Sequence, residues 1–507
     1  MNQLHSIISS FSIEEQQRFM LFLEKRNKRV DTKNIQLFKI AQKGETSTKL
    51  ICEELYGAQK KEAFYTLKQR LYESLIDFIA NNKIQGENSV DMLLIKYILA
   101  ARDFLLYKNN KAAYKILDKA EVIAKEYQLF PILNEIYHTK IQYAHTIHTI
   151  NFNETVVYFK ENQRNLFLEE ELNIIYAKVR HTLKTSTHKH SLDFQSLINM
   201  LFKEHQINIK QDLSFKSLYQ LISIVNISAF IHKDYLRTEV FLTDTYRLLN
   251  EKKGKEKQVF YHIRVLYLIA NTLFRNKKFK ESLEYLNSMH SYMLQNKKKY
   301  FNSFYLNYIL LSALNYNYTN NQKTAIKLLE TVLKKKHSDV KTMLEIKLSL
   351  ITFYFQSNEF KKALQLYTKL NHSDQWYIDK AGIEWTVKKS LIEILLHLEL
   401  QNIDLFESRL LSFKRKHIQF LLDINQERVI TFLKLVEQYY KNPDIVTTSD
   451  FFNLVENSFV FIGAKQEDIF VMSFYAWLKS KMTKQPIYDV TTALIKEVQL
   501  QRPHQKI

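Results

Sequence analysis

Apolar residues between Gln258 and Leu370 recur at intervals of three and four, which places their side chains on one face of an α-helix. Three times in succession, a small or apolar residue in this stretch is followed twelve residues later by a small one. Further apolar residues follow each second member at offsets of four and seven. The three pairs are Ala270 and Ser282, Ala313 and Ala325, and Ile351 and Ala363. Because a small residue lets one helix cross closely over another, the pattern predicts three helix-turn-helix units in a row.

The spacing of these small residues resembles that of the tetratricopeptide repeat (TPR) family, whose units pair small residues across two antiparallel helices. The segments IANTLFRNKKFKESLEYL and LITFYFQSNEFKKALQLY carry the likeness best. Each includes an aromatic residue, Phe279 or Phe360, three positions before the small residue, whereas the middle unit has Gln322 there. The resemblance implies an all-α fold in which helix pairs stack into a right-handed superhelix, a TPR-like solenoid, and it implies no chemistry.

Weaker matches extend the repeat pattern from about residue 90 to residue 440. The expected heads of the second helices are Ala113, Thr155, about Leu197, Thr238, Ser282, Ala325, Ala363 and Ser408. Successive heads are about 38 to 45 residues apart, which exceeds the ~34 residues usual in the family, and we expect longer helices to absorb the difference. Residues 441 to 507 lose the period and are expected to form an irregular helical cap at the C-terminal end.

Residues 1 to 83 do not show the repeat and are expected to form a small helical domain of three helices. A capping box at Ser12 and Glu15 predicts the start of the first, and Thr48 that of a second, which ends at Tyr56. After Gly57 a long third helix is expected, with one apolar face made of Phe64, Leu67, Leu71, Leu75 and Phe78. Such a domain is typical of either a helix-turn-helix DNA reader or a cap or docking domain.

The polar face of this third helix favours the cap or docking domain. At 100° per residue, Glu62, Gln69 and Glu73 fall opposite the apolar stripe. A recognition helix would have to present that face to DNA, and carboxylates there would meet a dense row of phosphates. We therefore expect duplex DNA to bind weakly and without sequence preference.

Composition excludes several classes of protein. A chain of 507 residues with only 6 Gly and 4 Pro has too few turn formers for a large sheet protein and too few glycines for a phosphate-binding loop. The single cysteine, Cys52, excludes a disulfide framework and a site built from several thiolates. No apolar run approaches the length of a membrane span. These features predict a soluble, cytoplasmic, almost entirely helical protein.

The formal net charge of +20 is compatible with a nucleic-acid partner, because clustered cations displace phosphate counterions. Of the 73 basic residues, however, 15 are Arg and the rest are Lys. Lysine is a point charge that lacks the planar fork with which arginine reads base edges. Nucleic-acid binding is therefore possible but is expected to be nonspecific.

The best candidate binding surface follows from the resemblance to TPR proteins, in which the first helix of each unit faces the concave surface. The residues placed there are Arg264, Tyr267, Asn271, Arg275, Asn307, Tyr318 and Gln356. Arginine can bind carboxylates and asparagine can bind a peptide backbone, so this mixture favours an extended peptide with acidic groups. An ordinary solvated helix face is the alternative.

Basic clusters follow the expected second helices. They are Lys252 and Lys253; Lys297, Lys298 and Lys299; Lys334, Lys335 and Lys336; and Lys414, Arg415 and Lys416. Because the junctions of a solenoid recur on one edge, we expect these residues to form a basic ridge. Each cluster could equally serve only to complement the dipole at the end of its own helix.

No catalytic motif, metal-ligand set or cofactor fingerprint is apparent, so the expected catalytic residues, metal and cofactor are none. The most favoured function is that of a scaffold or adaptor, without catalysis, that binds a protein or an acidic peptide through the repeats. The alternative is a transcription regulator with an N-terminal DNA-binding domain and peptide-sensing repeats. The sequence leaves the oligomeric state open.

Overall fold

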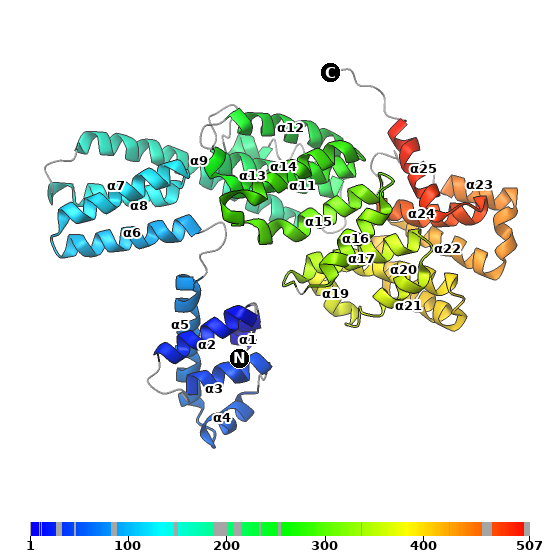
Figure 1. Cartoon of the computed structure of the whole chain (residues 1–507), viewed down its shortest axis with the longest axis horizontal. Coiled ribbons are helices and arrows are strands. Elements are labelled where there is room, and N and C mark those ends of the chain that lie inside the picture. Colours follow the sequence, from blue (N-terminus) through cyan, green and yellow to red (C-terminus); the bar gives the residue numbers. More distant parts are fainter. Residues whose placement is uncertain are drawn as a thin grey trace. The chain divides into compact units, whose positions relative to one another are not determined.

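In the parts of the chain that it describes, the computed structural model consists of helices joined by turns and loops (Figure 1). These parts are residues 2–9, 11, 13–26, 33–44, 47–82, 89–146, 151–185, 200–205, 214–232, 235–251, 255–335, 337–424, 426–458 and 469–500. No strand occurs in these ranges, and the all-α expectation is confirmed. The chain divides into two compact units, Met1–Ala120 and Glu121–Ile507.

The first unit contains a hydrophobic core that extends from Leu4 to Phe78. Its helices are α1 (Asn2–Ser9), α2 (Ile13–Arg26), α3 (Lys33–Lys43), α4 (Thr48–Tyr56), α5 (Lys61–Asn82), α6 (Ser89–Leu106) and the start of α7 (Asn110–Glu126). Two helices, α1 and α3, add to the three expected before residue 83. Both are short, and their buried Leu4 and Phe38 belong to the same core as the longer helices. Two or three helical turns carry too little periodicity to be recognised from sequence alone.

The two helices on either side of Gly57 begin and end close to the expected residues. The Ser47 side chain accepts a hydrogen bond from the Leu50 N–H at the start of α4. Gly57 ends the helix with φ at 62°, a left-handed conformation that suits glycine. All five residues of the expected apolar face of α5 are buried, and Glu62, Gln69 and Glu73 are exposed. The predicted orientation of α5 is thus confirmed.

The second unit is a succession of helices. They are α8 (Phe130–Gln142), η1 (Ala144–Thr146), α9 (Phe152–Thr185), α11 (Phe215–His232), α12 (Tyr235–Glu251), η2 (Lys255–Lys257), α13 (Val259–Arg275), α14 (Phe279–Lys298), α15 (Phe301–Asn317), α16 (Gln322–Leu333), α17 (Val340–Gln356), α18 (Phe360–Tyr367), α19 (Asp374–Ala381), α20 (Ile383–Glu399), α21 (Ile403–Asp423), α22 (Glu427–Lys441), η3 (Pro443–Thr447), α23 (Ser449–Ser458), α24 (Ile469–Thr483) and α25 (Ile487–Leu500).

Three helix pairs occupy the stretch in which the spacing of small residues predicts helix-turn-helix units. They are α13 with α14, α15 with α16 and α17 with α18, and each pair packs against the next. The first helices α13, α15 and α17 also contact one another in order. All six predicted residues, from Ala270 to Ala363, are fully buried, and the Ser282 hydroxyl donates a hydrogen bond to the carbonyl of Ala270 across the first pair. The burial expected from the twelve-residue spacing is therefore confirmed.

The predicted repeat is wrong or untested at its weaker positions. Thr155 lies half-buried in the first turn of α9, a single helix of 34 residues, and Leu197 lies outside the described residues. Ser408 is exposed, because Phe406 and Leu410 take the buried positions of α21. The short helix α19 is inserted between the pair α17–α18 and the pair α20–α21, so the spacing no longer follows a constant period.

The last two helices contact the C-terminal ends of α13, α15 and α17. Gln356, at the C-terminal end of α17, donates a hydrogen bond of 2.9 Å to Ser473 of α24. Tyr488 of α25 donates one of 2.5 Å to the carbonyl of Asn317, and Gln499 donates one of 2.6 Å to the carbonyl of Lys277. The C-terminal helices thus satisfy backbone carbonyls at the ends of α15 and α13, which helix geometry leaves without intrahelical partners.

No described helix is both long enough and apolar enough to cross a lipid bilayer.

Candidate functional site

The predicted peptide-binding residues of α13 differ in exposure. Arg264 is exposed, donates a hydrogen bond of 2.9 Å to the hydroxyl of Tyr219, and lies 5.2 Å from the ring of Phe260. Asn271 is half-buried. Arg275 is half-buried too, and its guanidinium lies 5.2 Å from the ring of Tyr235. The aromatic contacts help to orient both guanidinium groups.

The pKa of Tyr267 on α13 is affected by charges on both α13 and α17. Burial raises the pKa of its hydroxyl; Arg275 lowers that pKa and Glu345 of α17 raises it, so both charges lie within electrostatic reach of the ring. On α15, the side-chain oxygen of Asn307 accepts a hydrogen bond of 3.5 Å from Thr342 of α17. Glu345 was not predicted, although it lies in the second turn of α17 and could have been found by comparing the polar positions of that helix with those of α13.

Tyr318 and Gln356 are not surface residues, and their assignment to the groove is corrected. Tyr318 is 8% exposed, and its ring packs against those of Phe274 and Phe279 at centroid distances of 6.3 and 6.0 Å. Gln356 is fully buried and accepts a hydrogen bond of 2.9 Å from Asn317. Both residues lie at the C-terminal ends of first helices, where the chain turns. At Gln356, helix α24 also packs on this end.

Only some of the residues predicted to form the basic ridge lie at junctions between helices. Lys297 and Lys298 end α14, Lys299 follows them, and all three are exposed, as are Lys334 and Lys335 after α16. Lys252, Lys253 and Lys336 lie outside the described residues.

The cluster of Lys414, Arg415 and Lys416 is not a junction, which corrects one of the four positions. It lies inside α21, which continues to Asp423. Lys414 forms an ion pair of 2.5 Å with Glu437, and Lys416 forms one of 2.6 Å with Asp374. Both lysines therefore contact carboxylates of neighbouring helices and do not form a free ridge, and Lys416 shares its carboxylate, Asp374, with Lys389.

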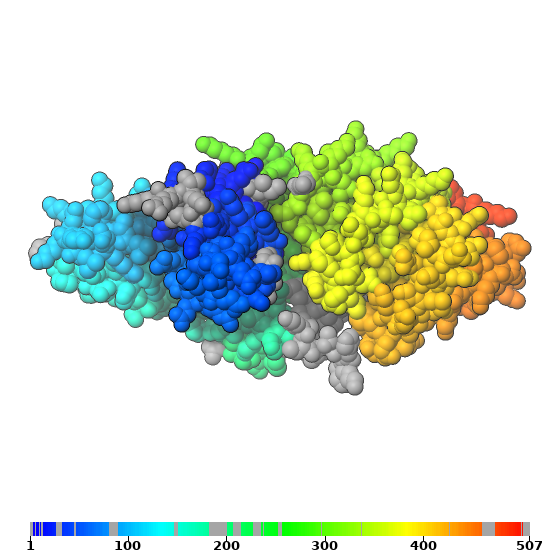
Figure 2. Space-filling view, turned by 90° about the horizontal axis from the view of Figure 1, so that it is seen from below, coloured from blue at the N-terminus to red at the C-terminus, as the bar shows by residue number. Residues whose placement is uncertain are grey.

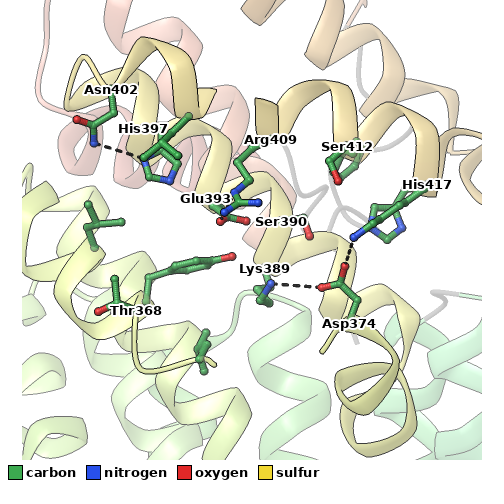
Figure 3. Close-up of a pocket in the computed structure, with 16 residues that line it drawn as sticks. Thr368, Asp374, Lys389, Ser390, Glu393, His397, Asn402, Arg409, Ser412 and His417 are labelled. Carbon is green, nitrogen blue, oxygen red and sulfur yellow. Dashed lines mark hydrogen bonds and ion pairs between the residues drawn. The ribbon is translucent and has the colours of Figure 1, made fainter. Parts of the chain in front are cut away.

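A pocket that the sequence did not predict lies between α18, α20 and α21, with the N-terminal residue of α19 at one side (Figure 3). Its volume is about 520 Å³, within the range of ligand sites in proteins. In Figure 2 the segment from α19 to α21, coloured yellow to light orange, forms part of the molecular surface. The pocket is lined by Leu364, Tyr367, Thr368, Leu370, Asp374, Lys389, Ser390, Glu393, His397, Asn402, Leu405, Arg409, Ser412, Phe413, Lys416 and His417.

Helix α20 supplies the polar floor of the pocket. Lys389, Glu393 and His397 follow one another at intervals of four, which places them on one face of the helix. The rest of α20 is largely apolar and buried. This polar stripe was visible in the sequence, but it matches no catalytic or metal-binding motif and so was not singled out.

At the α19 side of the pocket, the carboxylate of Asp374 pairs with two lysines. Asp374 is 2.6 Å from the Nζ of Lys416 and 3.6 Å from the Nζ of Lys389. Burial by itself would raise the pKa of Asp374, but the two ammonium groups outweigh it and hold that pKa below its ordinary value. The Lys389 side chain is 9% exposed and also lies 5.3 Å from the ring of Tyr367.

The middle of the pocket holds a second ion pair. The Nε of Arg409 is 2.9 Å from Glu393. Burial raises the pKa of the neighbouring Tyr367 hydroxyl, and the Glu393 carboxylate raises it further, so Tyr367 stays neutral. Figure 3 shows the pair Arg409 and Glu393, and the uncharged phenol of Tyr367 lies within electrostatic reach of both.

Two buried histidines complete the lining. Burial lowers the pKa of both His397 and His417, so each imidazole is neutral at pH 7. His397 is 3.4 Å from the side-chain nitrogen of Asn402. His417 is 4% exposed, and its Nδ1 has no hydrogen-bond partner within the described parts of the chain. With neutral histidines, the three cations and two carboxylates of the lining sum to a net charge of +1.

A comparison with protein-family models and with curated proteins finds no match to either. Among the described residues, no group of three or more His, Cys, Asp or Glu side chains is arranged to hold a metal ion. The described residues thus offer two candidate sites: a polar row on α13, α15 and α17, and a charged pocket between α18, α20 and α21.

Proposed function

We propose that the repeats form a right-handed, TPR-like solenoid that binds a protein or peptide partner and catalyses no reaction. The observation that carries this proposal is the row of polar side chains on three successive first helices. The row consists of Arg264, Tyr267, Asn271 and Arg275 on α13, Asn307 on α15 and Glu345 on α17. Stacked repeats are suited to binding because they present equivalent positions side by side over an extended surface.

The chemistry of the row favours an extended peptide with acidic groups. The row contains two arginines and one carboxylate, that of Glu345, so its formal net charge is +1. Arginine and tyrosine are the residue types that contribute most energy to protein interfaces, because they combine a large contact area with directional hydrogen bonds. Asn271 and Asn307 can donate to and accept from a peptide backbone.

The proposal is tested by capture of partners on the immobilised full chain, followed by mass spectrometry, with two matched double variants. Arg264→Glu with Arg275→Glu reverses charge on α13. Lys280→Glu with Lys327→Glu makes the same change at exposed positions of the second helices α14 and α16. We expect the first variant to lose the captured partner and the second to retain it, with unchanged helical content in both. Capture that survives in the first variant contradicts the assignment of the surface.

A further inference from the structure

We propose that the pocket between α18, α20 and α21 binds a small organic carboxylate, whose acid group is held by Lys389, Lys416 and His417. This inference does not depend on the proposed peptide surface. That surface lies on the first helices α13, α15 and α17, whereas the pocket opens between two second helices, α18 and α21, above the first helix α20. The two sites therefore use different residues and different helices.

Lys389 and Lys416 carry two positive charges but share one carboxylate, so they are only partly neutralised. Both ammonium groups depend on the same carboxylate, Asp374, and Lys389 is the more distant of the two at 3.6 Å against 2.6 Å. Lys389 is also the more deeply buried, with a side chain 9% exposed against 45% for Lys416. A buried cation is costly unless an anion and hydrogen bonds compensate it. A ligand carboxylate beside Lys389 would supply the second anion that the pair lacks.

His417 gives an independent reason to expect a ligand at the same side of the pocket. Its Nδ1 is buried and has no hydrogen-bond partner within the described residues, although buried polar atoms are nearly always paired. The charges of Asp374, Lys389 and Lys416 all affect the pKa of the imidazole, so these side chains lie within electrostatic reach of it. A neutral imidazole can donate one hydrogen bond, and a carboxylate oxygen is a suitable acceptor.

The net charge of the residues that line the pocket indicates which ligand charge would be neutralised there. Three cations and two carboxylates leave +1, which one carboxylate neutralises. A phosphate monoester would carry nearly two negative charges and would leave the pocket net negative. The charge balance thus favours a monocarboxylate over an organic phosphate.

The remaining lining favours a ligand with further polar groups. Ser390, Thr368, Asn402 and the Tyr367 hydroxyl offer hydrogen-bond donors and acceptors away from the lysines. The volume of about 520 Å³ exceeds what acetate would fill. A hydroxy or keto acid of several carbons fits both the polarity and the size.

The test is isothermal titration of the full chain with lactate, gluconate and inorganic phosphate, and with lactamide and gluconamide as neutral analogues. We expect at least one of the two carboxylates to bind with a Kd below about 1 mM, and its amide to bind at least about tenfold more weakly. The variant Lys389→Met should weaken carboxylate binding by about tenfold or more. Lys327→Met, an exposed lysine of α16, is the matched control and should bind as the unmodified chain does.

A second variant separates loss of the site from loss of the fold. Ser412→Trp adds volume at the pocket wall without removing any of the three ion pairs, and it should abolish binding while the circular dichroism spectrum is retained. The proposal is overturned by any of four results: neither carboxylate binds in this range, the amide binds equally well, phosphate binds more tightly than both carboxylates, or binding persists in both pocket variants.

Discussion

The Oγ of Ser282 donates a hydrogen bond of 2.8 Å to the carbonyl oxygen of Ala270. Ala270 lies on α13 and Ser282 on α14, and both residues are fully buried. Asn315 of the next first helix, α15, donates to the same Ser282 Oγ at 3.0 Å. A small residue at this position thus allows a side chain to reach the backbone of the opposite helix, and it ties one helix pair to the next.

Enlarging Ser282 should destabilise the repeats. Ser282→Leu forces a larger side chain into a packed crossing and removes the acceptor of Asn315, so we expect the free energy of unfolding to fall by about 1–3 kcal/mol or more. Chemical denaturation followed by circular dichroism measures the change. Ser288→Leu, at an exposed position of the same helix, is the control and should change stability by less than about 0.5 kcal/mol. Equal effects of the two substitutions would show that the crossing is not closely packed.

Removing α25 should destabilise the helix pairs that precede it. Deletion of residues 487–507 exposes the surfaces that Ile487, Val490 and Ile495 cover and removes the bonds to the carbonyls of Asn317 and Lys277. We expect a lower melting temperature and faster hydrogen exchange at the C-terminal ends of α13 and α15. Tyr488→Phe, which removes only the hydroxyl, should cost about 0.5–1.5 kcal/mol. Unchanged exchange at α13 and α15 after the deletion would contradict the packing described for α25.

Stability should fall as the pH is lowered from 7.5 to 5.5. Burial lowers the pKa of His397 and His417 in the folded chain, whereas the unfolded chain takes up protons near the ordinary value of about 6.5. The unfolded state therefore binds more protons in this window, and acidification favours unfolding. The double variant His397→Gln, His417→Asn should show a shallower dependence of the unfolding midpoint on pH. An equally steep dependence in the variant would assign the effect to other groups.

The N-terminal domain should not bind DNA specifically. The exposed face of α5 carries Glu62, Glu73 and Asp77, and Asp77 is paired with Arg26 at 2.6 Å. In a gel-shift titration at about 50 and 200 mM salt, we expect weak binding that falls steeply at the higher salt. Deleting residues 1 to 83 should leave that binding nearly unchanged. Tight binding of one sequence that survives the higher salt and is lost on the deletion would favour a transcription regulator instead.

Features that depend on nearby residues were predictable from the sequence. The burial of Ala270 with Ser282 follows from a spacing of twelve residues, and the bounds of α4 follow from the local signals at Thr48 and Gly57. The apolar face of α5 likewise needed only the helical period. In each case the residues that determine the structure are close together in the chain.

Features that depend on distant residues were missed. One side of the pocket is lined by Asp374 and by Lys416, 42 residues further along the chain, and the sequence contains no sign of that pairing. Tyr488 binds the carbonyl of Asn317 across 171 residues. Gln356 was assigned to the surface by family resemblance, but the side chain of Ser473 and α24 bury it. Resemblance to a repeat family describes the helix pairs and does not include the segments that a particular chain packs on them.

The most direct test of partner binding through the first helices is site-specific photocrosslinking. A photoreactive amino acid is placed at Asn271 of α13 or Asn307 of α15, both half-buried, and at Lys280 of α14 or Lys327 of α16 as exposed controls on the second helices. We expect the same partner to crosslink at Asn271 and Asn307 and not at the two lysines. Crosslinks confined to the lysine positions, or equal at all four, would contradict the proposed binding surface.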